Sequence, residues 1–495
     1  IIGAQLLFGW RRLCLCVRLR MRWLRLRMCR RGQVRLNLNL LKRKPQGSLV
    51  RPGLWAYQLE GVDGHARVHL RVEEDGSGLI LINANRAVHL NPTATYMAWL
   101  DLEGNSEDQA LRSLSRSFRV EKNTLADDYR QTVERIHSLA LSDGACPIHD
   151  LELDIDAPLS NQPSAPYRMD LALTYRCNEN CSHCYNARPR TYPELDTRAW
   201  ESIISQLWEV GIPHICFTGG EATLREDLPA LISCAEDNGQ ITGLLSNGRR
   251  LSDYGYAKSL RDAGLDHVQI TIESARSDVH DGMVRAKGAW QDTVAGIRNA
   301  LDLGLFVMTN TTLLMANASH IVETIDFLAD LGVPTIGCNA LIYSGKGKDV
   351  GTGIPEERLA PLLDAVKDVT ERNGQRLIWY TPTQYCHFDP VQMQLGVKAC
   401  TAAQYNMCVE PDGNVIPCQS FYEPLGNMLQ DPWDAIWNHD LALWLRERKY
   451  VPDSCHGCAI LEECGGGCPL SLLNQDNQQP LSFSDYAVSQ IQMRG

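Results

Sequence analysis

The stretch RCNENCSHCY, residues 176–185, places Cys177, Cys181 and Cys184 within eight positions, with His183 between the last two. It follows MDLALTY, residues 169–175, a short apolar run that predicts a buried strand. In α/β proteins the chemistry gathers at the carboxyl edge of a parallel sheet, so we expect the cysteine loop to lie at such an edge.

The loop could hold a metal in two ways. A closed zinc site needs four ligands in a tetrahedron, and the three cysteines with His183 could supply them in number. However, His183 is adjacent to Cys184, so both side chains would have to fold back onto one ion. Three cysteines with no reachable fourth ligand are better suited to a [4Fe–4S] cluster with one open iron.

Strand-like and helical segments alternate after this loop. The strand-like runs are HICFTGGE (214–221), GLLSNG (243–248), HVQITIESA (267–275), FVMTNTTLL (306–314) and TIGCNALI (335–342). Amphipathic stretches such as RAWESIISQLWEVG (198–211) and WQDTVAGIRNALDLG (290–304) separate them. Together with the first strand they predict an α/β fold, a partial (β/α)6 barrel over residues 167–380.

The pattern CxxxCxxC after the first strand, with TGGE (218–221) after the second, resembles the radical S-adenosylmethionine superfamily. The resemblance implies that the methionyl amino and carboxylate groups bind the open iron. It implies that the cluster donates one electron, which breaks the C5′–S bond and gives a 5′-deoxyadenosyl radical that abstracts hydrogen from the substrate. A flavodoxin-type or ferredoxin-type electron donor is implied as a partner.

The resemblance also assigns a cofactor-binding set. Its members are His183, Gly219, Gly220, Glu221, Ser246, Asn247, Thr271, Glu273 and Arg285. Gly219 and Gly220 would let the backbone approach the cofactor, and Glu221 would accept a hydrogen bond from the methionyl amino group. Ser246 and Asn247 end the third strand.

The remaining members have less specific spacings. His183 would lie against the adenine ring, Thr271 and Glu273 would meet the ribose, and Arg285 would meet the methionyl carboxylate. The alternatives are a strand-end polar cap for Thr271 and Glu273 and a surface position for Arg285.

The carboxyl-terminal region is rich in cysteine. Of the 18 cysteines, eight fall between Cys386 and Cys468, a clustering that favours metal ligation in a reducing, cytoplasmic compartment over disulfides. The run CHGCAILEECGGGC (455–468) resembles the SPASM extension, which houses auxiliary iron–sulfur clusters, and we assign residues 381–495 to it. A zinc ribbon is the alternative.

The predicted metal ligands are Cys177, Cys181, Cys184, Cys386, Cys400, Cys408, Cys418, Cys455, Cys458, Cys464 and Cys468. The SPASM pattern ends with a further downstream cysteine, which this chain lacks. One or two auxiliary [4Fe–4S] clusters are therefore expected, with the division of ligands open and an oxygen ligand such as Asp476 as one solution. Cys216 and Cys338 lie in strand-like runs and are predicted core residues.

Residues 54–142 form a separate module. ARVHLRVEED (66–75), GLILINAN (78–85) and RAVHL (86–90) predict three strands, and three helices follow, the first capped by Asn91. The layout resembles the winged-helix PqqD-like family, in which the leader of a ribosomal precursor peptide adds as an extra strand. The expected edge is residues 87–90, facing residues 129–139. A bare winged-helix unit that binds DNA or nothing is the alternative.

Charge separates the first residues from the rest. The first 45 residues carry 13 Lys and Arg and no acid, whereas the remainder holds 35 bases against 59 acids. We expect residues 1–50 to be a basic leader that is disordered or an artefact of the sequence, and residues 143–166 to be a linker. The acidic body argues against nucleic acid as a partner, and the absence of a long apolar run argues against a membrane span.

These features predict a radical enzyme that modifies a ribosomally synthesised precursor peptide, forming a thioether or carbon–carbon crosslink. One alternative is a SPASM maturase that acts on a folded protein or a small cofactor precursor. Another is a non-enzymatic iron–sulfur adaptor that binds peptides.

Overall fold

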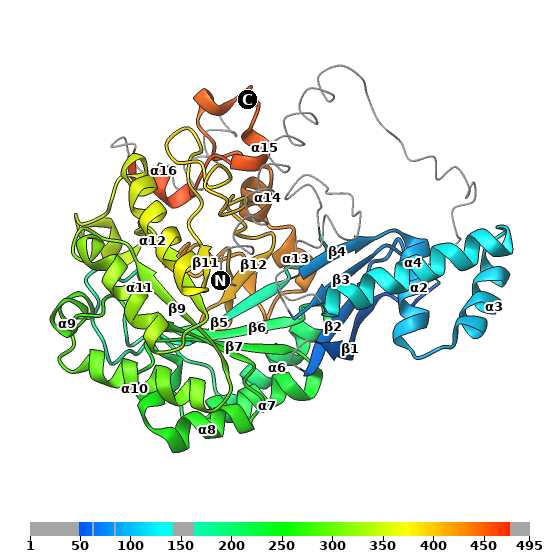
Figure 1. The fold of residues 1–495 in the computed structure, drawn as a ribbon, viewed down its shortest axis with the longest axis horizontal. Helices are drawn as coiled ribbons and strands as arrows, with labels where there is room; N and C mark the ends of the chain where they lie inside the picture. The colour runs from blue at the N-terminus through cyan, green and yellow to red at the C-terminus, as the bar shows by residue number, and fades with distance from the viewer. Residues whose placement is uncertain (1–48, 62–63, 84–85, 142–162, 476–495) are drawn as a thin grey trace, which may run out of the picture.

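The parallel strands of the barrel are the centre of the computed structural model, which describes residues 49–61, 64–83, 86–141 and 163–475 (Figure 1). Six strands lie side by side in chain order and confirm the predicted (β/α)6 arrangement. They are β5 (Arg168–Thr174), β6 (His214–Gly219), β7 (Ile241–Ser246), β8 (His267–Thr271), β9 (Phe306–Thr312) and β10 (Thr335–Asn339).

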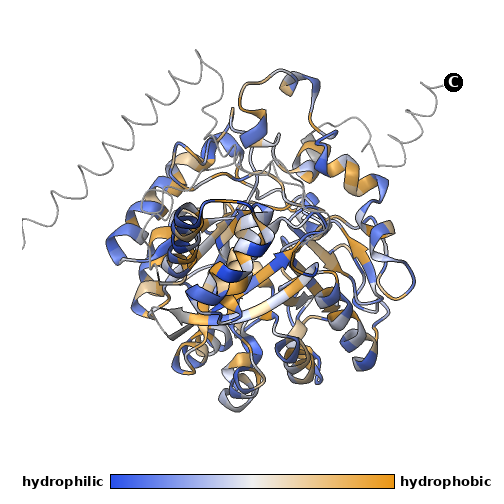
Figure 2. Ribbon diagram, turned by 90° about the vertical axis from the view of Figure 1, so that its right-hand side faces the viewer, coloured by the Kyte–Doolittle hydropathy of each residue, from blue (hydrophilic) through white to orange (hydrophobic). Residues whose placement is uncertain are grey.

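Helices cover the outer face of these strands. They are α6 (Thr197–Glu209), α7 (Leu228–Asn238), α8 (Tyr254–Asp262), α9 (Ser277–Val284), α10 (Ala289–Asp302), α11 (Ile321–Asp330) and α12 (Leu359–Asn373). Met169, Leu171 and Leu173 of β5 belong to the same buried cluster as Trp200 and Ile204 of α6, because alternate strand residues face the helices. Figure 2 shows hydrophobic and hydrophilic residues on the same surrounding helices, as amphipathic packing requires.

The sheet extends beyond the six predicted strands. On one side β11 (Arg376–Trp379) pairs in parallel with β10, and on the other β12 (Asn406–Val409) pairs in parallel with β5. The strands β13 (Asn414–Ile416) and β14 (Gly426–Asn427) follow in antiparallel order. The cysteine-rich region therefore contributes three strands to the barrel sheet, which was not predicted.

Short helices complete the carboxyl-terminal region. They are α13 (Trp433–Trp437), α14 (Asp440–Arg446), α15 (Leu461–Cys464) and α16 (Pro469–Gln475). The single-turn 3-10 helices are η1 (Ala222–Leu224), η2 (Arg249–Ser252), η3 (Ala318–His320), η4 (Gly345–Lys348), η5 (Glu356–Arg358) and η6 (Asp453–Cys455). Within the described ranges, no helix is long and apolar enough to cross a membrane.

The amino-terminal module is an antiparallel sheet with three helices. Its strands are β1 (Gly53–Gly61), β2 (Gly64–Val72), β3 (Gly78–Ile82) and β4 (Arg86–Leu90), paired in that order, and its helices are α2 (Pro92–Leu102), α3 (Glu107–Ser117) and α4 (Lys122–Leu141). The predicted cap is present, since the Asn91 side chain accepts from the Thr93 and Ala94 amides.

The prediction of three strands in this module was wrong, because β1 adds a fourth. Its sequence pattern held the signal: Trp55, Tyr57 and Leu59 alternate with smaller or polar residues and pack against the module core. Of the remaining expectations, residues 1–48, most of the linker 143–166 and Asp476 lie outside the described residues, and the domain boundaries remain predictions.

The face of the sheet opposite the helices contacts the barrel floor, where the strands begin. From β2, Arg67 donates to Glu236 (2.7 Å), Asp266 (3.0 Å) and the Gln240 carbonyl (3.0 Å). Two residues along, His69 Nε2 lies 2.8 Å from the Gly239 carbonyl oxygen. The strand β3 is consequently buried on both faces. This explains why GLILI is continuously apolar rather than alternating.

Candidate functional site

The cysteine loop leaves β5 at the carboxyl edge of the barrel, as predicted, and neighbouring loops hold its backbone. The Asn180 amide donates to the Val284 carbonyl (3.0 Å), and the Ser182 amide donates to the Met283 carbonyl (2.9 Å). On the other side, the Lys346 amide donates to the Cys184 carbonyl (2.9 Å). The loop is thus fixed by the segments that follow β8 and β10.

The two glycines of the TGGE motif pack against the start of this loop. A Cβ atom on Gly219 would lie 2.1 Å from the Thr174 carbonyl oxygen, and one on Gly220 would lie 2.4 Å from the Arg176 carbonyl oxygen. The Gly220 and Glu221 amides donate to those same carbonyls at 2.7 and 2.8 Å. The structure therefore requires glycine at both positions for the contact between two backbone segments. The expected approach of the cofactor to this backbone remains a prediction.

Glu221 joins three of the predicted residues into one buried cluster. Its side chain is 1% exposed. Its Oε1 accepts from Thr223 Oγ1 (2.6 Å) and Ser246 Oγ (2.9 Å), and its Oε2 accepts from the Asn247 amide (2.8 Å). Burial raises the pKa of Glu221, although these hydrogen bonds act in the opposite direction. The structure brings Glu221, Ser246 and Asn247 together at the ends of β6 and β7.

His183 and Glu273 form a second buried pair. His183 Nε2 lies 2.9 Å from Glu273 Oε1, and the Thr312 amide donates to Glu273 Oε2 (2.9 Å). Burial lowers the pKa of His183, but the Glu273 carboxylate outweighs that effect, so the net direction is upward. The two residues were predicted to contact adenine and ribose separately, and the structure shows them bound to each other.

Thr271 and Arg285 lie at the edge of this arrangement. Thr271 ends β8, where it pairs with Asn310 and is half-buried. Arg285 is exposed and adopts a left-handed backbone conformation (φ 52°) directly after α9. It follows Val284, whose carbonyl holds the cysteine loop, so its backbone is close to the predicted cluster site. The contacts predicted for both side chains remain predictions.

The thiols of the loop are half-buried, and burial raises the pKa of Cys177 to about 12. The Glu179 amide donates to Cys177 Sγ at 3.4 Å, the type of N–H···S bond that stabilises a thiolate ligand. A [4Fe–4S] cluster fits this donor set, because three soft thiol ligands leave one iron open. In the described part of the chain, no three His, Cys, Asp or Glu side chains converge on a site for one metal ion.

Three residues that support the loop were not predicted. Gly345 lies against it so closely that a Cβ atom would be 2.7 Å from the Cys184 carbonyl oxygen. Arg249 donates to the Asn178 carbonyl (3.0 Å), and Arg190 donates to the carbonyls of Cys177 and Glu179. The stretch SGKGK (344–348) could have predicted the contact at Gly345, because closely spaced glycines often mark a place where two backbone segments approach each other.

The remaining predicted ligands lie in the carboxyl-terminal region. Cys386 and Cys400 precede β12, Cys408 lies within it, Cys418 follows β13, Cys455 ends η6, Cys458 follows η6, Cys464 ends α15 and Cys468 precedes α16. Cys408 packs with Ala172, Tyr175 and Ile416, so its side chain belongs to a small buried cluster at the sheet. Cys216 and Cys338 are fully buried in strands, as predicted.

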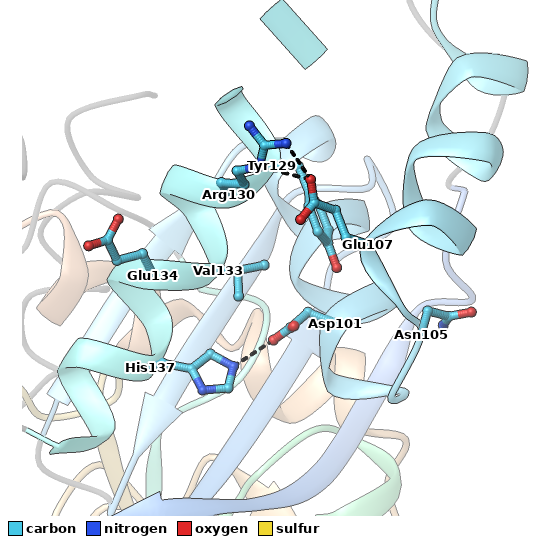
Figure 3. Close-up of a pocket in the computed structure, with 8 residues that line it drawn as sticks. All are labelled: Asp101, Asn105, Glu107, Tyr129, Arg130, Val133, Glu134 and His137. Carbon is cyan, nitrogen blue, oxygen red and sulfur yellow. Dashed lines mark hydrogen bonds and ion pairs between the residues drawn. The ribbon is translucent and has the colours of Figure 1, made fainter. Parts of the chain in front are cut away.

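A separate groove of about 430 Å³ lies between α2, α3 and α4 of the amino-terminal module (Figure 3). Asp101 and Glu107 line it and pair with His137 and Arg130 across it. Tyr129 and Val133 of α4 also line it. The groove is therefore lined mainly by polar and charged side chains, and it includes part of the helix expected to face a bound peptide.

Two family profiles match the chain. Residues 171–339 match the Radical SAM superfamily, and residues 400–459 match SPASM, an iron–sulfur cluster-binding domain. These matches confirm the predicted cofactor classes: S-adenosylmethionine with a [4Fe–4S] cluster in the first domain and auxiliary clusters in the second.

Individual proteins are also similar to parts of the chain. The Fe-coproporphyrin III synthase of Methanosarcina barkeri is 28% identical over 324 residues, covering 59% of this chain and 81% of that protein. The PqqA peptide cyclase of Xanthomonas euvesicatoria is 29% identical over 327 residues, covering 61% and 82%. The crystal structure of Streptococcus suis SuiB bound to precursor peptide SuiA has the same fold, with a TM-score of 0.62 at 16% identity, covering 86% and 98%.

Proposed function

We propose that this chain, which carries a radical SAM domain and a SPASM domain, is an enzyme that modifies a ribosomally synthesised precursor peptide by radical chemistry. When bound, S-adenosylmethionine on a [4Fe–4S] cluster supplies a 5′-deoxyadenosyl radical that abstracts hydrogen. Cys177, Cys181 and Cys184 would hold the cluster. The buried Glu221 carboxylate would orient the methionyl amino group.

The observation that carries the peptide proposal is the attachment of the amino-terminal sheet to the barrel floor through Arg67 and His69. This attachment fixes a sheet with an edge strand to the domain that would generate the radical. The sheet has two edge strands, β1 and β4, and a leader that pairs with β4 would hold the core peptide at high local concentration.

The carboxyl-terminal end of α4 lies against the edge strand β4. The last turn of α4 reaches β4, because Arg86 donates to the Leu139 carbonyl, whereas the rest of α4 contacts α2, α3, β1 and β2. Val88 and Leu90 of β4 pack toward the module core, whereas Ala87 and His89 are exposed. We therefore propose main-chain pairing along β4, with leader side chains contacting the end of α4.

The comparisons support this proposal. The relatives named PqqA peptide cyclase and the SuiB structure with its precursor peptide are proteins that act on or bind a peptide. The fold likeness to SuiB covers 86% of the chain and so extends beyond the barrel and the cysteine-rich region. A thioether or carbon–carbon crosslink remains the product we propose.

A second candidate is the modification of a small cofactor precursor. The similarity to Fe-coproporphyrin III synthase favours it, because that protein matches a similar share of the chain at nearly the same identity as the PqqA peptide cyclase. The amino-terminal module would then have no role in substrate capture, which is the point at which the two candidates differ.

The deciding experiment is co-expression with a candidate precursor peptide, followed by mass spectrometry. Formation of 5′-deoxyadenosine together with a loss of two mass units per modification would support a crosslinking enzyme. An unchanged peptide mass in both H2O and D2O, with continued 5′-deoxyadenosine formation, would favour the small-precursor candidate. If protein that contains all of its clusters does not cleave S-adenosylmethionine, the non-enzymatic adaptor is the candidate that remains.

The role of the module is tested by Arg67→Ala. This change leaves Asp266 and Glu236 without their partner and should weaken the docking by about 1–3 kcal/mol. We expect modification at low peptide concentration to fall several-fold while peptide-independent cleavage of S-adenosylmethionine persists. The control is Arg112→Ala, an exposed arginine of α3. Equal peptide modification by both variants would contradict a recruiting module.

We also propose that a flavodoxin-type or ferredoxin-type protein supplies the electron and that the enzyme works in the reducing cytoplasm. Thiolate-bound clusters and the unpaired cysteines support the compartment. Reduction of the loaded enzyme by a purified flavodoxin system, compared with dithionite, tests the donor.

A further inference from the structure

A second cavity, of about 130 Å³, lies where the amino-terminal sheet meets the barrel floor. It is separate from the cysteine loop, which lies at the opposite, carboxyl edge of the strands. His69 and Leu81 line it from the amino-terminal sheet, and Tyr167, Arg168 and His214 line it from the barrel. The cavity has room for several water molecules or one small polyatomic ion, and it is smaller than the pockets that bind drug-sized ligands.

Arg168 brings hydrogen-bond donors to this cavity. Its Nε donates to Asp170 Oδ1 (2.6 Å), and Asp170 Oδ2 accepts from Gln419 Nε2 (2.6 Å). Among the described residues, the two terminal nitrogens of the Arg168 guanidinium have no hydrogen-bond partner. The side chain keeps 32% of its surface accessible, and it lines the cavity. A guanidinium has five N–H donors, so most of those of Arg168 lack an acceptor.

His69 brings a hydrogen-bond acceptor. Its Nε2 lies 2.8 Å from the Gly239 carbonyl oxygen, and because a carbonyl oxygen only accepts, Nε2 must carry the proton of the ring. Burial lowers the pKa of His69 to about 4, so the ring is neutral near pH 7 and Nδ1 has a lone pair. This Nδ1 atom is buried and has no partner in the described part of the chain.

His214 lines the same cavity from the start of β6. It is 8% exposed, and its Nε2 is buried without a partner among the residues that the structure describes. Burial lowers the pKa of His214, and the neighbouring His267 and Arg168 lower it further, so this ring is neutral as well. Buried polar groups in folded proteins are nearly always paired. Three unpaired groups around one cavity therefore indicate a bound species.

The polar groups define the chemistry of that species. The positive charge of Arg168 disfavours a metal cation and favours the oxygen atoms of an anion. The lone pair of His69 Nδ1 requires a hydrogen-bond donor in the same ligand. A small oxyanion that retains one hydroxyl group, such as hydrogen phosphate, satisfies both requirements. Sulfate has the same charge as HPO₄²⁻ but has no hydroxyl group near neutral pH.

We propose that this cavity binds one small oxyanion that carries a hydroxyl group, with its charged oxygens on Arg168, its hydroxyl donating to His69 Nδ1, and His214 as the third contact. Because His69 belongs to the amino-terminal sheet whereas Arg168 and His214 belong to the barrel, the ligand would join the two parts of the chain. The site lies apart from the radical chemistry, so the inference does not rest on the proposed function.

Calorimetric titration with inorganic phosphate tests the site in full-length, cluster-loaded protein that has been exchanged into phosphate-free buffer at pH 8. We expect saturable binding of one phosphate per chain, unchanged by a saturating concentration of S-adenosylmethionine. Sulfate is the matched probe, because at pH 8 phosphate is mainly HPO₄²⁻, which has the same charge and shape. Phosphate should bind about tenfold more tightly than sulfate, since sulfate would leave His69 Nδ1 unpaired.

Variants of the lining residues locate the binding. His69→Phe should bring the affinities for phosphate and sulfate together, a loss of preference that misfolding would not produce. Arg168→Gln should weaken both anions by about tenfold or more. Leu81→Phe removes no charge but fills the cavity, so it should abolish the binding of both anions. The control is Arg112→Gln, at an exposed arginine of α3, which should bind both anions as the wild-type protein does.

Three results would overturn the inference. They are the absence of saturable phosphate binding, equal affinities of the wild-type protein for phosphate and sulfate, and unchanged phosphate binding by Leu81→Phe. The first of these results would mean that the cavity holds water alone. Because no measurement uses peptide modification, the outcome is independent of the proposed enzymatic function.

Discussion

At the residue scale, the carboxylate of Glu221 already has several hydrogen-bond donors from its own chain. It accepts hydrogen bonds from Thr223, Ser246 and the Asn247 amide. The carboxylate therefore holds the ends of β6 and β7 together before any cofactor binds. A residue assigned to cofactor binding therefore also stabilises the fold, and its substitution affects both.

Glu221→Gln should show the two effects separately. The amide group would direct donors toward the hydroxyl of Ser246 or the amide of Asn247, leaving a buried donor without an acceptor. We expect a loss of about 1–3 kcal/mol in the free energy of unfolding of the metal-free protein, measured with urea. We also expect loss of S-adenosylmethionine cleavage. The exposed Glu226→Gln is the matched control and should change neither quantity.

The sequence identified the residue types of this site but not their pairing. The motif placed Glu221 beside the cysteine loop, and the ends of adjacent strands predicted that Ser246 would be near. The bond between His183 and Glu273 was not predictable, because it depends on how deeply the loop enters the barrel. That depth is fixed by residues distant in sequence, such as Gly345.

At the element scale, the six barrel strands were predictable because buried parallel strands and amphipathic helices have different apolar periods. The strands β11 and β12 were missed because each is only four residues long. In addition, no helix separates them, so they do not continue the alternation of strands and helices that identified the other strands. Strand β1 was missed despite its alternating pattern. Elements that depend on pairing with distant partners were therefore the least visible in the sequence.

The contact between β5 and the TGGE loop gives a prediction about glycine. Gly220→Ala would place a Cβ atom 2.4 Å from a backbone oxygen, so backbone must shift. We expect a destabilisation of about 1–3 kcal/mol in urea unfolding. Gly282→Ala, inside α9 with no atom within 4 Å of the new Cβ, should be neutral or stabilising by about 0.5–1 kcal/mol. Equal effects of the two substitutions would contradict the close contact.

At the scale of the whole molecule, neutral histidines lie between the amino-terminal sheet and the barrel. His69 is 1% exposed, and the rings of His214 and His267 lie 5.1 Å apart in the barrel floor. Burial lowers the pKa of His69 to about 4 and that of His267 to about 4. Arg67 lowers the pKa of His69 further, whereas Asp266 raises it.

This arrangement predicts that acid weakens the protein. Because the folded pKa of His69 lies below the ordinary value of 6.5, the unfolded chain takes up the proton first as the pH falls. Stability should be complete above pH 6.5 and should decrease down to about pH 4, by about 3 kcal/mol for His69 alone. Urea midpoints between pH 7.5 and 4.5 measure it. His69→Gln should have a shallower slope, and an unchanged slope would contradict the assignment.

The pairing of β12 with β5 has a consequence for how the protein is made. On the ribosome, β5 emerges early, and the strand that covers its open edge follows only after the rest of the barrel has been synthesised. During that interval a nascent chain presents an unpaired, apolar strand edge, which is a site for association with other chains. Slow translation or chaperone shortage should therefore reduce the yield of this protein even when its cofactors are abundant.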